Sequence, residues 1–363
     1  MDTVSIQKFS YGNKYSQISL GFCEIATQPL HDNLAMLKIE EIQAVIADQL
    51  RPVKAYMERK DVTELMINPG GHVYVEAKGV ITYEGKLLTS MAIDMALTAV
   101  AKWVGQDALA GSKSALVGAS IEDMRIAGAK APTCPDGSFL TIRKHQDKGD
   151  RPTLDRLIEM GALTPAQAAK LVELVVDKRM NCIVAGATGS GKTTLLNALL
   201  SRIQPSERLI TIEDSREMQL SIPNVINLLS NPTNNIHARD LVQLAMRLRP
   251  DRLILGETRG HETYDLIRAF NSGHPGSVST IHADSAEQAL DALEMLYQMS
   301  LPPNASMPPE LVRRYIAKSV HLVVFAGRRN VPQGDVINVV RRIEQICLVK
   351  GVENGEYVLE DVA

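Results

Sequence analysis

One segment limits the possible folds of this chain more than any other feature: residues 186–193 read GATGSGKT and match the pattern G-x-x-x-x-G-K-[ST] in full. Residues 181–185 are short, apolar and β-branched, as in a buried strand, and residues 194–200 favour a helix. In a strand–loop–helix setting, glycines let successive backbone N–H groups turn inward around phosphates, and the helix N-terminus adds partial positive charge. The segment is therefore predicted to be a phosphate-binding loop.

The loop predicts which residues hold a nucleotide. Lys192 is placed to reach the β- and γ-phosphates, and Thr193 is placed to bind Mg²⁺. ATP and Mg²⁺ are the expected cofactors. The residues expected to surround the phosphates are Gly186, Ala187, Thr188, Gly189, Ser190, Gly191, Lys192, Thr193 and Thr194.

Acidic residues follow two further apolar segments. Residues 208–212 are predicted to form a strand that ends in Glu213 and Asp214, where a carboxylate can meet the metal or its waters. Residues 252–255 are predicted to form a buried strand that leads to Glu257. A carboxylate just beyond the γ-phosphate can orient and partly deprotonate water, which hydrolysis needs and phosphate transfer to a substrate does not. Glu257 is therefore the expected base, and Glu213 is expected to support metal or water.

Two histidines flank a third predicted strand, residues 277–281. His274 precedes it and His282 follows it. A single histidine is usually a packed or surface residue, but the pair is interpreted as γ-phosphate sensors or links to a neighbouring subunit. Zinc binding is disfavoured, since no cysteine or further histidine lies at ligand spacing.

The order and spacing of four boxes resemble those of the secretion ATPases, which power type II and type IV secretion, conjugation and type IV pili. The boxes are the phosphate-binding loop, the acidic box at residues 210–217, residues 248–260 and the histidine box at residues 272–283. The resemblance covers roughly residues 50–350 and is strongest for the conjugation and type IV secretion branch, the TrbB-like traffic ATPases.

The resemblance implies a homo-hexameric ring that works with other components of a membrane-embedded secretion or conjugation machine. It also implies that Arg125 and Arg143 approach the nucleotide, where a planar guanidinium donates two parallel hydrogen bonds to a polyphosphate. The alternative for each arginine is a surface salt bridge.

Length and composition agree with a soluble protein of two domains. The chain has 363 residues, 45% of them apolar and 22% charged, and a net charge of −3. No apolar run approaches about 18 residues and no signal sequence is visible, so a cytoplasmic protein peripherally associated with the inner membrane is expected. The mildly acidic balance gives no strong signal for nucleic-acid binding. The pairs Arg313-Arg314, Arg328-Arg329 and Arg341-Arg342 are interpreted as solvated faces or, alternatively, contacts with an anionic leaflet.

Four scattered cysteines, Cys23, Cys134, Cys182 and Cys347, form no C-x-x-C pair and are expected to be reduced thiols. The zinc module of four cysteines that is common in the type II branch is missing.

Periodicity divides the chain into four expected parts: an N-terminal extension (1–35), an α+β domain with an antiparallel sheet (36–145), a polar linker (146–152) and a phosphate-binding-loop ATPase domain (153–363). In the last, strands alternate with helices at residues 238–248, 261–270 and 286–299. This predicts an α/β fold, a RecA-like P-loop NTPase with a mainly parallel sheet covered on both faces. Strands at 321–326, 336–340 and 345–349 are expected to close it.

The resulting hypothesis is an ATP-hydrolysing hexameric motor that energises type IV secretion or conjugative transfer, including pilus biogenesis and substrate translocation. Two alternatives stay open: a motor for type IV pilus retraction, and a nucleotide-gated assembly scaffold with little turnover.

Overall fold

The fold is described from a computed structural model, which describes residues 40–77, 79–105, 115–121, 124–144, 152–232, 235–333 and 336–362. The predicted extension (1–35) and all of the predicted linker except Pro152 lie outside these residues. The N-terminal part contains a helix at residues 40–49, η1 (Arg51–Val53), α2 (Lys54–Glu58), β1 (Val62–Asn68), η2 (Pro69–Gly71), β2 (His72–Ala77), β3 (Val80–Lys86), α3 (Ser90–Trp103), β4 (Leu116–Ile121), β5 (Met124–Ala129) and β6 (Phe139–Lys144).

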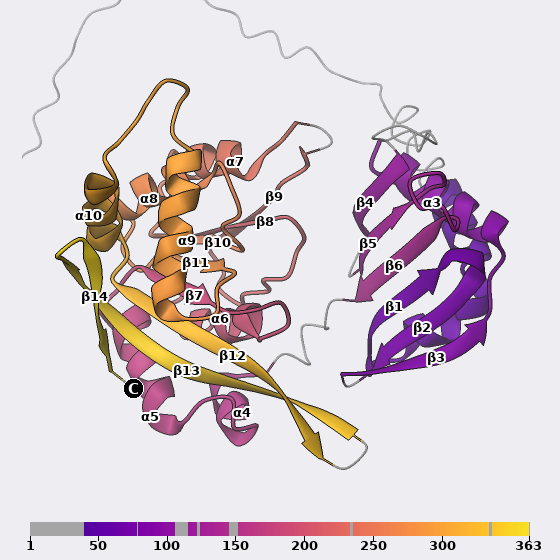
Figure 1. Ribbon diagram of the computed structural model, residues 1–363, viewed down its shortest axis with the longest axis horizontal. Helices are drawn as coiled ribbons and strands as arrows, with labels where there is room; N and C mark the ends of the chain where they lie inside the picture. Colours follow the sequence, from indigo (N-terminus) through magenta and orange to yellow (C-terminus); the bar gives the residue numbers. More distant parts are fainter. Residues whose placement is uncertain are drawn as a thin grey trace, which may run out of the picture.

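These six strands form one antiparallel sheet in the order β3-β2-β1-β6-β5-β4 (Figure 1). Alternate residues of the central strands are buried, among them Leu65, Ile67 and Ile142. They pack in one cluster with Ile93 and Leu97 of α3. The α+β architecture with an antiparallel sheet is therefore as the period-two pattern predicts.

The C-terminal part alternates strands and helices. Its elements are α4 (Leu154–Glu159), α5 (Pro165–Leu171), a π-helical turn η5 (Val172–Asp177), β7 (Cys182–Ala185), α6 (Lys192–Leu200), β8 (Leu209–Glu213), β9 (Val225–Leu229), α7 (Ala238–Ala245), β10 (Arg252–Leu255), α8 (Thr263–Asn271), β11 (Val278–Ile281), α9 (Ala286–Met299), α10 (Pro309–Ser319), β12 (Leu322–Gln333), β13 (Val336–Glu353) and β14 (Glu356–Asp361).

One sheet joins the eight strands in the order β14-β13-β12-β7-β11-β10-β8-β9. All pairs from β12 to β9 are parallel, and only the β12–β13 and β13–β14 pairs are antiparallel. Successive residues of β7 belong to different cores: Cys182 and Val184 pack with α4, α5 and α6, whereas Ile183 and Ala185 pack with the helices α7 to α10. Helices therefore cover both faces, as predicted for a mainly parallel sheet (Figure 1).

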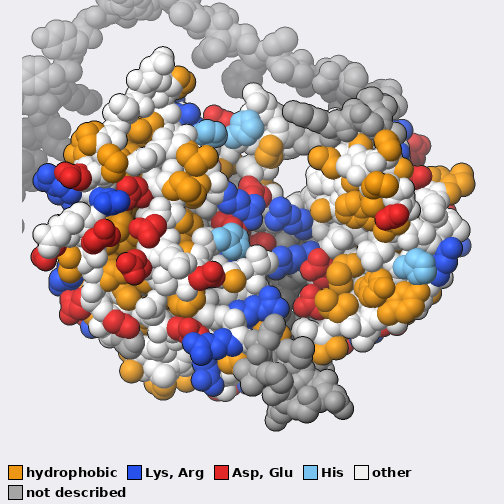
Figure 2. All heavy atoms as spheres, viewed as in Figure 1, with side chains coloured by type: hydrophobic (Ala, Val, Ile, Leu, Met, Phe, Trp, Pro, Cys, Tyr) orange, Lys and Arg blue, Asp and Glu red, His pale blue; other side chains and the backbone are white. Residues whose placement is uncertain are grey.

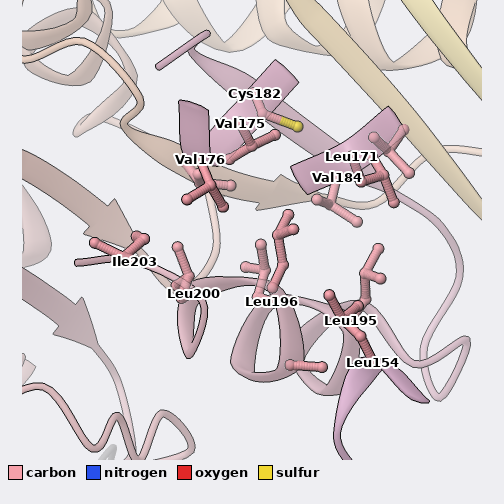
Figure 3. Packing of buried hydrophobic residues seen from close by; sticks show 14 of the residues in the cluster. Leu154, Leu171, Val175, Val176, Cys182, Val184, Leu195, Leu196, Leu200 and Ile203 are labelled. Atoms are coloured by element: carbon pink, nitrogen blue, oxygen red, sulfur yellow. The ribbon is translucent and has the colours of Figure 1, made fainter. Parts of the chain in front are cut away.

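The core beneath the phosphate-binding loop is close-packed (Figure 3). Leu195, Leu196 and Leu200 of α6 face Val184 of β7 and the π-helical turn, and all of these leucines are buried. Burial also raises the pKa of the Cys182 thiol, which acts here as a packing group. Because the strand before the loop and the helix after it are both fixed in this core, the loop between them has a defined position.

Several expectations about elements are wrong in detail. The two strands expected at residues 336–340 and 345–349 form one long strand, β13, because its pairing with β12 continues across Arg341 and Arg342. Strand β12 likewise extends beyond the expected end at residue 326, to Gln333. Strand β9 and helix α10 were not expected. Strand β9 is only half-buried and helix α10 is amphipathic, so the sequence pattern of each is weak.

A buried ion pair joins the strands to the π-helical turn. Arg252 is 0% exposed and donates to both carboxylate oxygens of Glu207, at 2.7 and 3.0 Å. The same guanidinium donates to the carbonyl oxygens of Val175 and Val176, at 2.5 and 2.8 Å. A Cβ at Gly276 would collide with this guanidinium, so a glycine is needed there.

Replacing Arg252 with leucine is expected to lower the free energy of unfolding by about 3–5 kcal/mol, because the carbonyl groups of Val175 and Val176 would lose their donor and Glu207 would keep only its ion pair with Arg179. Chemical denaturation monitored by circular dichroism measures this. Arg202→Ala is the matched control: its pair with Asp155 is exposed, so its loss should cost less than about 1 kcal/mol. Equal effects of the two substitutions would contradict a structural role of the buried pair.

Candidate nucleotide site

The geometry of the loop at residues 186–191 requires its glycines. Gly186, Gly189 and Gly191 have φ angles of 152°, 73° and 97°, a region that other residues rarely adopt. A Cβ at Gly186 would collide with the carbonyl oxygen of Ala326 and with Oγ of Ser190. Helix α6 then begins at Lys192 with no side-chain cap and no acidic residue in its first turn. Its first N–H groups are therefore available to an anion, as a phosphate site needs.

Lys192 is buried at the base of this loop. Its ammonium group donates to the carbonyl oxygens of Gly186, at 2.6 Å, and Ala187, at 3.1 Å. Burial lowers the pKa of the Lys192 amine, and nearby Glu257 opposes that shift. The protein groups therefore balance the buried positive charge of Lys192 only in part. A bound anion would stabilise this charge further.

His282 lies between Lys192 and Glu257. Its Nδ1 is 3.5 Å from Nζ of Lys192, and its Nε2 is 2.5 Å from Oε1 of Glu257. The three residues come from the ends of different segments: α6 begins at Lys192, His282 follows β11 and Glu257 follows β10. The structure therefore brings together three residues that sequence analysis assigned separately.

The backbone around Glu257 is fixed to β11. Thr258 donates its N–H to the carbonyl oxygen of Thr280 at 2.8 Å, and the Thr280 hydroxyl donates to the carbonyl oxygen of Gly256 at 2.6 Å. The hydroxyls of Thr258 and Ser279 are 2.7 Å apart. The backbone on both sides of Glu257 is therefore held to β11.

Glu213 is buried, and its side chain lies against Gly256, the residue before Glu257. Its Oε1 accepts the N–H groups of Glu217, at 3.0 Å, and Met218, at 2.8 Å, so it orders the acidic loop after β8. Asn197 of α6 binds the same loop: it donates to the carbonyl oxygen of Glu217 at 3.3 Å and accepts the N–H of Gln219 at 3.0 Å.

Arg259 connects the two acidic segments. It forms ion pairs with Glu257 and with Asp214, the latter at 2.8 Å. The pKa of Arg259 is raised, mainly by its hydrogen bond with Glu257, and burial partly opposes this rise. Arg259 and Asn197 were not singled out by sequence analysis, because neither has a pattern of its own and each acts through residues distant in the sequence.

His274 does not share the site with His282. The two residues lie at opposite ends of β11, and Nδ1 of His274 is 3.1 Å from the carbonyl oxygen of Ala269. Only His282 contacts Lys192 and Glu257, so the two histidines do not act together as γ-phosphate sensors at one site. A link from His274 to a neighbouring subunit stays a prediction.

Arg125 and Arg143 lie on neighbouring strands of the N-terminal sheet. They are directly opposite each other in the β5–β6 pair, and Glu64 is opposite Arg143 in the β1–β6 pair. Burial raises the pKa of the Glu64 carboxyl, and Arg143 opposes that shift. Within the described parts of the chain, neither arginine has a hydrogen bond or ion pair with the loop at residues 186–193. Figure 2 shows Lys, Arg, Asp and Glu side chains gathered along the hollow between the two parts of the molecule.

The residues of the loop fit a nucleotide with Mg²⁺. The uncapped start of α6 suits phosphates. Oxygen donors are available from three elements: Thr193 lies in the first turn of α6, Glu213 ends β8 and Glu257 follows β10. Among the described residues, no three histidines, cysteines or carboxylates are grouped to hold a metal by themselves. Mg²⁺ usually keeps waters and phosphate oxygens as ligands, so such a sparse protein donor set is the kind it takes.

A family comparison decides the relationship of this chain. The model of the family described as type II/IV secretion system protein matches residues 58–329. The chain belongs to this family. The match includes all four sequence boxes and the residues that surround the loop.

Individual family members support the conjugation and type IV secretion branch. A probable conjugal transfer protein TrbB of Sinorhizobium fredii is 32% identical over 325 residues, which are 89% of this chain and 93% of that protein. The type IV secretion system protein PtlH of Bordetella pertussis is 33% identical over 317 residues, 80% of this chain and 93% of that protein.

Solved structures share the fold. The ATPase DotB of Legionella pneumophila is similar with a TM-score of 0.56 and 16% identity, covering 82% of this chain and 80% of DotB. The pilus retraction motor PilT with bound ADP is similar with a TM-score of 0.54 and 18% identity, covering 81% and 82% of the two chains. Both confirm an α/β architecture of this family. No helix among the described residues is long and apolar enough to cross a membrane.

Proposed function

We propose that this family member is an ATP-hydrolysing motor that energises a type IV secretion or conjugative transfer system. The observation that carries the proposal is the contact of His282 with both Lys192 and Glu257 at the carboxyl edge of a parallel sheet. Hydrolysis of a phosphate bond needs a group that holds the phosphate and a carboxylate that activates water at one site, and Lys192 and Glu257 are suited to these two roles. The names of the relatives support the secretion and conjugation role.

The loop residues have a binding role in this proposal. Backbone N–H groups of residues 186–194 and the ammonium group of Lys192 hold the phosphates of ATP in a RecA-like P-loop site. Thr193 binds Mg²⁺, and Glu213 supports the metal or its waters. When bound, Mg²⁺ neutralises charge on the phosphate oxygens.

Glu257 is the proposed base. It orients a water molecule in line with the γ-phosphate and accepts a proton from it as the bond from the water oxygen to the γ-phosphorus forms. The bond from that phosphorus to the β,γ-bridging oxygen breaks, and ADP leaves. His282 senses the γ-phosphate, since it contacts both the residue that binds this group and the base. Arg259 holds Glu257 and Asp214 in register, so the base keeps one orientation.

The positions of Arg125 and Arg143 suggest how hydrolysis could move the N-terminal part relative to the C-terminal part. If Arg125 and Arg143 bind phosphate from the N-terminal part, loss of the γ-phosphate weakens their contact with the C-terminal part, and the two can separate as rigid bodies. We propose a homo-hexameric ring in the cytoplasm, peripherally associated with the inner membrane through the secretion complex.

The scaffold alternative needs no base, and the fixed position of Glu257 beside Lys192 and His282 argues against it. A pilus retraction motor would use the same site, and the likeness to PilT concerns the fold alone. The sequence relationship with TrbB and PtlH favours the secretion branch.

Gene replacement in the host bacterium tests the proposal. A host that produces Glu257→Gln protein at normal level should lose conjugative transfer or type IV secretion, while twitching motility that depends on pilus retraction is unchanged. Normal transfer with lost twitching would support the retraction motor instead. Normal activity of both would contradict a hydrolysis-driven role.

Arg143→Ala should lower ATP turnover at least tenfold if the guanidinium binds phosphate, and Arg143→Lys should restore little, because a point charge cannot replace a bidentate fork. Phosphate release by purified protein measures both variants. A surface salt bridge is worth only about 0.2–1 kcal/mol, and lysine would replace arginine well in it. Wild-type turnover of Arg143→Ala would remove the phosphate role.

Mixed rings of Arg143→Ala and Glu257→Gln subunits show which subunit's loop Arg143 serves. We expect Arg143 to serve its own subunit, so every site in a mixed ring carries one defect and turnover stays absent. If Arg143 acts across the subunit boundary, some sites combine an intact Arg143 with an intact Glu257, and turnover returns. Recovery would therefore contradict the own-subunit assignment.

A further inference from the structure

The β12–β13 hairpin extends past the end of the sheet beside the phosphate-binding loop (Figure 1). Strand β12 pairs with β7 only from Leu322 to Phe325, and then continues to Gln333 while β7 turns into the loop. The carbonyl oxygen of Ala326 lies against Gly186, where a Cβ would collide with it. The hairpin therefore forms a wall of the loop on the side away from Glu257, which follows β10.

Two arginines of this hairpin contact the loop. Arg328 and Arg341 are opposite each other in the β12–β13 pair, so both side chains lie on one face. Arg328 donates to the carbonyl oxygen of Thr188 at 3.1 Å, and Arg341 donates to the carbonyl oxygen of Gly189 at 2.7 Å. A Cβ at Gly189 would be 3.3 Å from Nη1 of Arg328, so the glycine lets the guanidinium approach.

The adjacent arginine behaves differently. Arg329 points to the other face and binds Glu344 through two hydrogen bonds, at 2.8 and 2.9 Å. Neither Arg328 nor Arg341 has an ion pair with an Asp or Glu of the described residues, and burial together with Arg328 lowers the pKa of Arg341. Both arginines are exposed on the hairpin, as the interpretation of a solvated face expects, but their guanidinium groups also contact the phosphate-binding loop.

The direction of a peptide group explains what these contacts do. In a trans peptide the carbonyl oxygen and the following N–H point in opposite directions. A guanidinium that holds the Thr188 oxygen on the outer side of the loop therefore turns the Gly189 N–H toward the inner side. The bond to the Gly189 oxygen fixes the next peptide in the same way. The loop is then already ordered before phosphate binds, so binding does not have to supply the free energy of ordering it.

We propose that Arg328 and Arg341 are positioning residues, which clamp the phosphate-binding loop from the β12–β13 hairpin and thereby set its affinity for nucleotide. The proposal rests on the proposed nucleotide site but adds a hairpin that no sequence box includes. It also means that a displacement of the hairpin weakens nucleotide binding without any change in Lys192 or Glu257.

Titration calorimetry of ATP and ADP into the full chain tests the clamp. The variants are Arg328→Ala, Arg341→Ala and, as matched control, Arg329→Ala. Because the clamp orders the loop around phosphates that both nucleotides share, each loop-contacting variant should lose about tenfold in affinity, by the same factor for ATP and ADP. KM for ATP should rise equally, and kcat at saturating ATP should stay within about twofold of wild type.

Arg341→Lys provides the rescue test. A single hydrogen bond to a carbonyl oxygen can be donated by lysine, so affinity should return to within about threefold of wild type. Thermal unfolding shows whether each variant is folded, and Arg341→Lys keeps the test valid if an alanine variant is not.

Three outcomes would overturn the clamp. Wild-type affinity of both alanine variants would make the contacts incidental. A loss for ATP alone, with lower kcat, would indicate direct contact with the γ-phosphate. An equal loss in Arg329→Ala would indicate general damage to the hairpin. Failure of wild-type protein to bind either nucleotide would instead contradict the proposed function itself.

Discussion

Glu257→Gln protein is expected to bind ATP with nearly unchanged affinity and to hydrolyse it about 10²–10⁴-fold more slowly than wild type. Glutamine keeps the size of the side chain and one acceptor oxygen, so it can keep a contact with Arg259 or His282 but not both, and it cannot accept a proton from water. The backbone bonds of Gly256 and Thr258 to β11 do not involve the substituted group, so the position of residue 257 should persist. Steady-state phosphate release and calorimetry measure the two quantities on one preparation.

A matched control separates this effect from a general loss of carboxylate. Glu344→Gln changes a carboxylate that pairs with Arg329 on the other face of the hairpin, and its turnover should stay within about twofold of wild type. If turnover of Glu257→Gln falls by less than about fivefold, the base lies elsewhere. Glu213→Gln would then be measured next, because Glu213 is a buried carboxylate that ends the neighbouring strand β8.

Lys192→Ala should lose nucleotide affinity about 100-fold or more, since the ammonium group is expected to make charge-assisted hydrogen bonds with two phosphates. Its bonds to the carbonyl oxygens of Gly186 and Ala187 would also be lost. Removal of a buried cation whose pKa is already lowered by burial offsets that loss, so the melting temperature should change little. Calorimetry with ATP and differential scanning calorimetry without it measure the two effects.

Lys170→Ala is the control for Lys192→Ala, because its ammonium group forms a partly exposed pair with Glu173 and should not affect ATP binding. Unaltered ATP affinity in folded Lys192→Ala protein would remove the loop at residues 186–193 from the active site. A large drop in melting temperature would show instead that Lys192 holds the loop together.

The sequence was most informative where the signal is local. The strand–loop–helix around residues 186–193, the strands that end before Glu213 and Glu257, and the β1–β2 hairpin each have a period and a turn that neighbouring residues specify. Helix α9 matches its expected range of residues 286–299, since an amphipathic pattern starts directly after the capping Ser285.

Contacts set by register across distant strands could not be predicted. Arg328 and Arg341 meet the loop only because β12 is parallel to β7 and the β12–β13 pair places them opposite each other. Arg259 pairs with Asp214, which is 45 residues away in the sequence. The separation of His274 from His282 has a simpler reason: one precedes β11 and the other follows it, so they lie at opposite ends of that strand.

ATP turnover by the purified full chain, in the presence of Mg²⁺, is the decisive measurement for a hydrolytic role. We predict steady phosphate release over many turnovers by wild-type protein, and release close to background by Lys192→Ala and Glu257→Gln proteins. A wild-type protein that binds ATP in calorimetry but releases phosphate no faster than Glu257→Gln would contradict the account and would identify the chain as a nucleotide-gated scaffold.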